Sequence, residues 1–339
     1  MIRTIATAAL TVVAVAGLFG RSSSGSGQSA EGQPNPPTLA HAYADVNGVR
    51  LHYVRAGRGP LMMFLHGFPE FWYEWKHQLA EFARDHTVVA PDLRGYNLSS
   101  KPEELSAYQM PNLVQDVQAL ATGLLESSGG STFTLVAHDW GGVVAWVFAA
   151  QHPQALDKLV ILNAPHPTIF GRELRENPAQ QQASQYMLMF RSAEAEALLS
   201  ENSYAWLKRA VLGANPSDVD TAAYVEAWSQ PGALTGGLNY YRASGVGPSP
   251  AKVPDGTSPP SAAPPPLVVR VPTLVIWGEK DTALLTGNLN GLDQLVPKLT
   301  VKRIPDGTHW IAREKPGEVN TLIRDFLAQP GGAAQPPRP

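Results

Sequence analysis

The stretch that decides the fold is FTLVAHDWGG, residues 133–142. The apolar run from Phe133 to Val136 predicts a buried strand. Asp139 and two glycines follow the run, and an apolar helical segment at 143–153 comes next. The frame A-x-D-x-G centred on Asp139 therefore predicts a sharp strand-to-helix turn of the G-x-S-x-G kind, with a carboxylate where that pattern has a serine.

Asp139 has two interpretations, because aspartate is also common as the N-cap of a helix. The buried strand before it and the small residue Ala137 favour the sharp turn. The glycines at 141 and 142 point the same way, since a Cβ would clash where such a turn approaches a neighbouring strand. We therefore interpret Asp139 as the residue exposed at the turn, near a helix N-terminus that favours its charged form.

Strands and helices alternate along most of the chain. The segment 41–57 alternates apolar and polar residues around Asn47-Gly48, which predicts a β-hairpin. We expect further buried strands within 60–75, 87–90, 156–167, 271–281 and 299–310, and helices at 111–126, 143–153 and 318–327. This alternation predicts an α/β fold, with a mostly parallel sheet and helices on both faces.

Two regions interrupt the alternation. Residues 168–245 have helical character and no buried strand, so we expect an inserted helical cap on a core formed by 41–167 and 267–329. Residues 246–266 are rich in proline, which predicts an exposed loop. The tail 330–339 is expected to be disordered.

Residues 1–40 predict a signal-like segment and a flexible linker. Arg3 precedes an uncharged stretch at 5–20, which is typical of a secretory signal and shorter than a spanning helix. We expect export to a secreted or periplasmic location, with no stable membrane span after processing. The alternatives are an N-terminal membrane anchor and a start codon assigned too early.

The composition excludes several classes of function. The net charge is −3 and there is no cysteine. Because nucleic-acid binding needs clustered Lys and Arg, we expect no nucleic-acid partner. The absence of cysteine excludes disulfides, thiolate catalysis and Cys-ligated metals. We expect neither a metal nor another cofactor, and the sequence leaves the oligomeric state open.

Three reactive side chains follow buried strands in the order Asp139, Asp281, His309. In an open parallel sheet, such residues meet at the carboxyl ends of the strands. Nucleophile, acid and histidine follow the same chain order in the α/β-hydrolases. Taken singly, Asp281 fits a surface turn and His309 an exposed loop, but the order favours a triad with His309 as base and Asp281 orienting it.

The chemistry of an aspartate nucleophile limits the reaction. A carboxylate can displace a leaving group from a saturated carbon and form an alkyl ester. Neutral His309 would then activate water to hydrolyse that ester. The loop at 66–69, HGFP, and the turn would supply backbone N–H groups of Phe68 and Trp140 for the oxyanion. Alkyl halides and epoxides both fit this scheme.

Six blocks of the sequence together resemble one family, the epoxide hydrolases of the α/β-hydrolase fold. The blocks are HGFPEFWYEWKHQL (66–79), VVAPDLRGYNLSSKP (88–102), HDWGG (138–142), NAPHP (163–167), WGEKD (277–281) and THW (308–310). The resemblance covers about 45–170 and 271–316. It implies an α/β-hydrolase fold and conversion of an epoxide and water to a diol through an ester on Asp139.

The resemblance also implies two ring-opening tyrosines from the cap. QYMLMF offers Tyr186 with Phe190 four residues later, and LNYYRA offers Tyr241 before Arg242. A phenol can donate a proton to a forming alkoxide at neutral pH. Each tyrosine could instead be an aromatic residue of the cap core. Tyr240 is the competing residue beside Tyr241.

The remaining expectations concern the pocket. We expect Phe68, Trp140, Met187 and Trp310 to line an apolar pocket for a small apolar epoxide. Glu70 and His138, which neighbour the catalytic residues in sequence, are candidates for positioning the hydrolytic water.

Two alternative functions remain open. A haloalkane dehalogenase would share the scaffold, but that family usually has a second halide donor, often Asn, at the place of Phe68. A non-catalytic binding protein on a hydrolase scaffold would not need the triad or the tyrosines.

Overall fold

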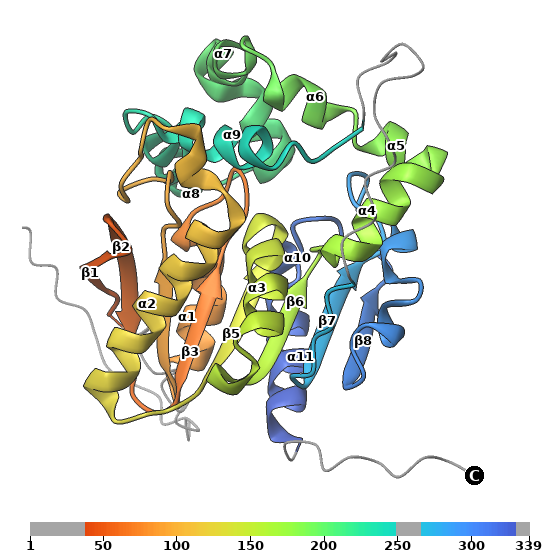
Figure 1. Cartoon of the computed structure of the whole chain (residues 1–339). Helices are drawn as coiled ribbons and strands as arrows, with labels where there is room; N and C mark the ends of the chain where they lie inside the picture. Colours follow the sequence, from red (N-terminus) through yellow and green to blue (C-terminus); the bar gives the residue numbers. More distant parts are fainter. Residues whose placement is uncertain (1–37, 249–265, 330–339) are drawn as a thin grey trace, which may run out of the picture. The chain divides into compact units, whose positions relative to one another are not determined.

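In a computed structural model of the chain, residues 38–248 and 266–329 are described, and they contain an eight-stranded sheet (Figure 1). Its order is β1-β2-β4-β3-β5-β6-β7-β8. The strands are β1 (Ala40–Val46), β2 (Val49–Ala56), β3 (Leu61–Leu65), β4 (Thr87–Pro91), β5 (Phe133–His138), β6 (Leu156–Leu162), β7 (Thr273–Gly278) and β8 (Leu299–Ile304). The predicted signal-like segment, the tail and most of the proline-rich loop lie outside the described residues.

The sheet is mostly parallel, as predicted. β3 to β8 pair in parallel, whereas β1 pairs antiparallel with β2, and β2 antiparallel with β4. The predicted hairpin is confirmed, because β1 and β2 are joined by Asn47 and Gly48 with φ of 46° and 75°. Positive φ at both turn positions is the reason that Asn-Gly is favoured there.

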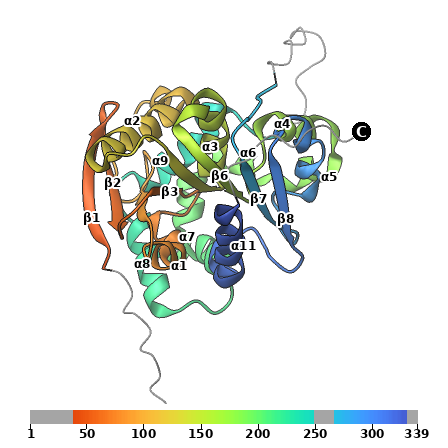
Figure 2. The ribbon, with the colours of Figure 1, turned by 90° about the horizontal axis from the view of Figure 1, so that it is seen from below.

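Helices cover both faces of the sheet, as Figure 2 shows. α2 (Met110–Ser128) and α3 (Asp139–Gln151) lie on one face, and α1 (Lys76–Phe82) and α11 (Pro316–Ala328) lie on the other. Alternate residues of one strand serve the two cores: Met63 and Leu65 of β3 pack on the α2–α3 side, and Met62 and Phe64 on the other. This double burial explains why the central strands read as continuous apolar runs.

A series of helices separates β6 from β7. It comprises α4 (Pro167–Glu176), α5 (Pro178–Ala183), α6 (Tyr186–Arg191), α7 (Ala195–Leu207), α8 (Asp218–Trp228) and α9 (Ala233–Ser244). In Figure 1, α6 to α9 lie beyond the end of the sheet at which the helix α3 begins. Within α7, the consecutive residues Asn202, Ser203 and Tyr204 form a left-handed turn, with φ of 49°, 55° and 62°. In the described part of the chain, no helix is long and apolar enough to cross a membrane.

Two element boundaries differ from the prediction near the carboxyl ends of the strands. The strand expected over 156–167 ends at Leu162, because Asn163 takes a left-handed φ of 35°. The helix expected from 143 begins at Asp139. A helix α10 (Ile311–Glu314) and a short 3-10 turn at Trp72–Trp75 flank the same end of the sheet. Both differences concern residues that shape the site described next.

Candidate active site

Asp139 lies at the turn between β5 and α3 with a left-handed φ of 47°. Non-glycine residues rarely adopt such a φ, and those that do cluster at functional sites. Its Oδ1 accepts a hydrogen bond from the Phe68 backbone N–H at 2.8 Å. An ordinary N-cap has extended φ and ψ and accepts from its own helix, so this geometry excludes the N-cap interpretation.

The two glycines after Asp139 allow close packing. A Cβ on Gly141 would lie 2.4 Å from the carbonyl oxygen of Leu65 in β3. A Cβ on Gly142 would lie 2.2 Å from the Cβ of Ala164 in the loop after β6. Both distances are far below normal contact, so α3 can start against the ends of β3 and β6 only with glycine at these positions.

The three predicted triad residues meet at this turn. His309 Nδ1 lies 2.7 Å from Asp281 Oδ2, and His309 Nε2 lies 3.6 Å from Asp139 Oδ2. Asp281 follows β7 and His309 follows β8, so the carboxyl ends of neighbouring strands carry both residues. Asp281 Oδ1 accepts the backbone N–H groups of Ala283 and Leu284 at 2.8 and 2.9 Å, which fixes the carboxylate.

The electrostatics of the triad follow from two carboxylates around one imidazole. Burial alone would raise the pKa of Asp139, but the hydrogen bond and charge of His309 outweigh it and lower that pKa. The pKa of Asp281 is lowered in the same way, against the effect of burial. Burial disfavours a charged His309, yet Asp281 and Asp139 hold its pKa well above the ordinary value. The resting site is therefore a histidinium between two carboxylates.

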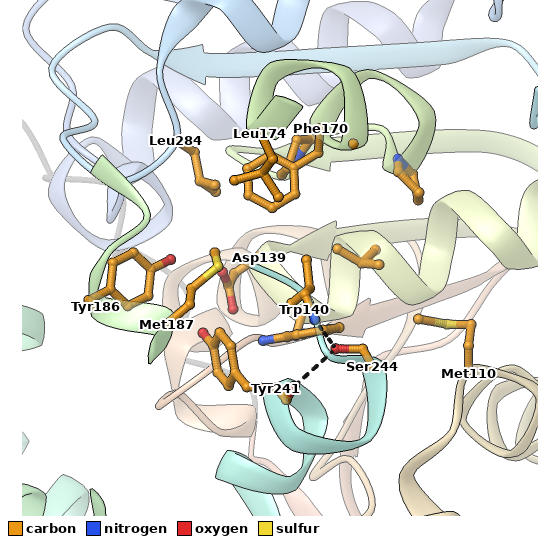
Figure 3. A pocket seen from close by; sticks show the side chains of 15 residues that line it. Met110, Asp139, Trp140, Phe170, Leu174, Tyr186, Met187, Tyr241, Ser244 and Leu284 are labelled. Carbon is orange, nitrogen blue, oxygen red and sulfur yellow. Dashed lines mark hydrogen bonds between the residues drawn. The ribbon is translucent and has the colours of Figure 1, made fainter. Parts of the chain in front are cut away.

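Tyr186 of α6 and Tyr241 of α9 face Asp139 across a cavity. In Figure 3 both hydroxyls point toward the part of the cavity that holds the Asp139 side chain. Burial, followed by the charge of Asp139, raises the pKa of each phenol well above its ordinary value. Both phenols are therefore protonated at neutral pH and can donate. Tyr240 points elsewhere, since its hydroxyl donates to the Arg94 carbonyl at 2.9 Å.

Two cavities meet at these groups, with volumes of about 270 and 450 Å³, and both are lined by Asp139, Tyr186 and Tyr241. The first also contains Trp140 and Met187, and the second Phe68 and Trp310. All four predicted pocket residues therefore line one of the two cavities. Apolar side chains such as Phe170 and Leu174 complete most of the first (Figure 3), whereas the second also includes Lys280 and Thr308.

The two candidates for positioning water differ. Glu70 is buried, its Oε2 is hydrogen-bonded to the Tyr224 hydroxyl, and its Oε1 has no partner among the described residues. Burial, together with the charge of Glu74, raises its pKa to about 8. Nε2 of His138 lies 3.0 Å from the His309 carbonyl oxygen, and Nδ1 lies 2.6 Å from Glu74 Oε1 without hydrogen-bond geometry. His138 is fully buried with both nitrogens against protein atoms, so Glu70 is the stronger candidate of the two.

Sequence reasoning missed two side chains of this site. Asn163 donates from Nδ2 to Asp281 Oδ2 at 2.8 Å, and its Oδ1 accepts the Gly278 N–H at 2.8 Å. A polar residue directly after the buried strand β6 is a signal that could have identified it. Glu74 contacts His138, but no feature of the aromatic stretch around it distinguishes it from a solvent-facing glutamate.

Comparison with known proteins places this arrangement in a family. The family described as alpha/beta hydrolase fold matches residues 60–316. Epoxide hydrolase 3 of Xenopus tropicalis is 39% identical over 296 residues, which cover 84% of this chain and 76% of that protein. Epoxide hydrolase 4 of Mus musculus is 37% identical, covering 87% and 82%. A crystal structure of a Bacillus megaterium epoxide hydrolase in complex with an inhibitor has a TM-score of 0.74 and 37% identity, covering 85% of this chain and 100% of that chain.

Proposed function

This chain belongs to the epoxide hydrolases of the α/β-hydrolase fold, and we propose that it opens its substrate through a covalent ester on Asp139. The observation that carries the proposal is the meeting of Asp139, Tyr186 and Tyr241 around one cavity. A carboxylate nucleophile and two neutral phenols are the groups that ring opening of an epoxide needs.

The first step forms the ester. Asp139 Oδ2, which is free of the Phe68 N–H, attacks one ring carbon, and the bond between that carbon and the ring oxygen breaks. The ring oxygen leaves as an alkoxide and takes a proton from one of the two phenols, while the other phenol donates a hydrogen bond. Because both phenols are protonated at neutral pH, either can serve as the acid.

The second step hydrolyses the ester. Esterification removes the negative charge of Asp139, so one of the two carboxylates that keep the pKa of His309 high is lost. The proton of His309 restores the phenol, and neutral His309 then takes a proton from water. The hydroxide attacks the carbonyl carbon of the ester. The N–H groups of Phe68 and Trp140 stabilise the resulting oxyanion, since first-turn N–H groups of a helix have no intrahelical partner. The bond from the carbonyl carbon to Oδ2 then breaks, and the diol leaves with Oδ2, which takes the proton of the new carboxyl group.

We further propose that Glu70 holds the attacking water through its Oε1, and that the substrate is a small epoxide with an apolar substituent. The lining of the 270 Å³ cavity, in which Met110, Val143 and Leu174 accompany the aromatic residues, supports an apolar substituent.

A single-turnover experiment in heavy-oxygen water tests the mechanism. We expect the label to enter Asp139 first, and the oxygen added to the diol to come from the enzyme. His309→Gln should let the ester accumulate, because only the second step uses the base. Label that goes directly into the diol would overturn the ester mechanism. A panel of 1-haloalkanes serves as the control for the dehalogenase alternative, and no halide release is expected.

A further inference from the structure

His138, the residue before the nucleophile, contacts both Glu74 and the base His309, and it does so away from the reacting atoms. Glu74 lies in the 3-10 turn at Trp72–Trp75 and is 2% exposed. Its Oε1 is 2.6 Å from Nδ1 of His138, which is fully buried. His138 Nε2 in turn lies 3.0 Å from the backbone carbonyl oxygen of His309. The rings of His138 and His309 pack with centroids 4.6 Å apart.

The contacts of the His138 ring show which of its nitrogens donates a hydrogen bond. A carbonyl oxygen only accepts, so Nε2 of His138 carries a proton and donates a hydrogen bond to the His309 carbonyl oxygen. Nδ1 of His138 faces Oε1 of Glu74 at 2.6 Å, a close polar contact without hydrogen-bond geometry. This buried contact holds the ring of His138 in the orientation in which Nε2 meets the His309 carbonyl.

His138 and Asp139 are adjacent, and both contact His309. His138 holds the backbone of His309, and Asp139 faces its imidazole at 3.6 Å. Two adjacent residues therefore supply the nucleophile and a contact to the backbone of the base, while the Phe68 N–H holds the nucleophile separately. If the His138 ring turned, the His309 carbonyl would lose its hydrogen bond from Nε2, and the loop that carries His309 would be held less firmly.

We propose that Glu74 is a positioning residue for the base, acting through His138 on the His309 carbonyl. The inference rests on the ester mechanism proposed above and extends it to a residue that touches no reacting atom. Ester formation requires Asp139 and the phenols but not the base. Ester hydrolysis requires His309 in place. Loss of Glu74 therefore slows the second step and leaves the first unchanged.

The test compares Glu74→Leu with Glu74→Gln. In Glu74→Leu, the polar contact with Nδ1 of His138 is lost, and the ring is free to turn. In Glu74→Gln, the amide has the same shape and can donate to Nδ1. Nε2 then still donates a hydrogen bond to the His309 carbonyl. Rapid quench with mass spectrometry of the protein measures ester formation and decay separately. We expect Glu74→Leu to slow ester decay roughly 10–100-fold, the effect of a displacement of about 1 Å, and Glu74→Gln to recover most of it.

Steady-state kinetics give a second signature. When ester hydrolysis limits turnover, kcat and KM fall together, so kcat/KM should stay within about twofold of the wild type in Glu74→Leu. A matched control is His52→Leu, which breaks another buried histidine–carboxylate pair, His52 Nδ1 to Asp92 Oδ2 at 2.6 Å. The control should lose stability without accumulating ester.

The outcomes separate the two proposals. If His309→Gln accumulates no ester, the ester mechanism fails. If His309→Gln accumulates ester but Glu74→Leu decays at the wild-type rate, or Glu74→Gln is as slow as Glu74→Leu, the positioning role fails.

Discussion

Gly142→Ala should destabilise the protein by packing alone. The added methyl group would lie 2.2 Å from the Cβ of Ala164, more than 1 Å short of the ~3.5 Å at which carbon atoms normally touch. An alanine methyl has no alternative rotamer, so α3 or the loop after β6 must move. Overpacking of this kind costs about 1–3 kcal/mol. The preference of a helix for alanine over glycine offsets up to about 1 kcal/mol of that cost.

A double-mutant cycle isolates the clash. Ala164→Gly removes the opposing methyl group, and alone it should cost up to about 1 kcal/mol, because it loses a buried methyl and loosens the loop. Combined with Gly142→Ala, it transfers the methyl from one side of the contact to the other. We expect a coupling free energy of at least about 1 kcal/mol, so the double variant should be nearly as stable as the wild type.

Gly141→Ala provides the contrast. Its methyl group would lie 2.4 Å from the Leu65 carbonyl oxygen and 2.5 Å from that of His66, both backbone atoms, so Ala164→Gly should give no rescue. The effects of Gly141→Ala and Ala164→Gly should add to within about 0.5 kcal/mol. Urea unfolding measures stability, and turnover should follow it, because the same packing positions Asp139. Additive effects at Gly142, or rescue at Gly141, would refute the reasoning.

Other predictions concern single side chains. Tyr186→Phe and Tyr241→Phe should each lower kcat/KM about 10²–10³-fold, as loss of one donor to a developing oxyanion does. Tyr240→Phe should change it by no more than a few-fold and cost about 1 kcal/mol in urea unfolding. Folded Glu70 has its pKa raised from 4.5 to about 8, so it binds a proton that the unfolded chain has released. The stability of Glu70→Gln relative to the wild type should therefore grow by about 1.4 kcal/mol per pH unit from about pH 5 to 8, then level off; a constant difference would contradict the buried carboxyl. Ser203→Gly should stabilise by up to about 1 kcal/mol in thermal unfolding, since it relieves a left-handed φ of 55°.

The fold and the triad can be predicted from the sequence because their signals are local. Asp139 and Asp281 follow buried strands, and parallel strands bring their carboxyl ends together without further information. His309 follows β8, which the sequence predicts to be buried but which is an edge strand with only Ile304 buried. Placing Tyr186 and Tyr241 needed the family resemblance as well. Tyr240 and Tyr241 are both good candidates by motif, and only the packing of α9 decides which of them faces Asp139.

Contacts between distant segments cannot be predicted in this way. Glu74 and His138 carry no pattern that indicates their pairing, because the approach of the 3-10 turn to β5 depends on side-chain packing. The sequence also gives no sign that His138 is fully buried with Nε2 against the His309 carbonyl, which is why it is predicted as a candidate for binding water. The two cavities cannot be predicted from the sequence either, because their walls come from distant segments: the strand ends and helices α4, α6 and α9.

The two oxygens of the Asp139 carboxylate have unlike neighbours, and this gives them unlike histories. Oδ1 is tethered to the Phe68 N–H, and Oδ2 faces His309. In the proposed cycle Oδ2 departs with each diol and is replaced from solvent, whereas Oδ1 dates from the synthesis of the protein. After many turnovers in isotopically labelled water, a carboxylate that never flips holds one heavy atom and a carboxylate that flips holds two. The mass of the peptide that contains Asp139 therefore measures how often this side chain rotates between catalytic cycles.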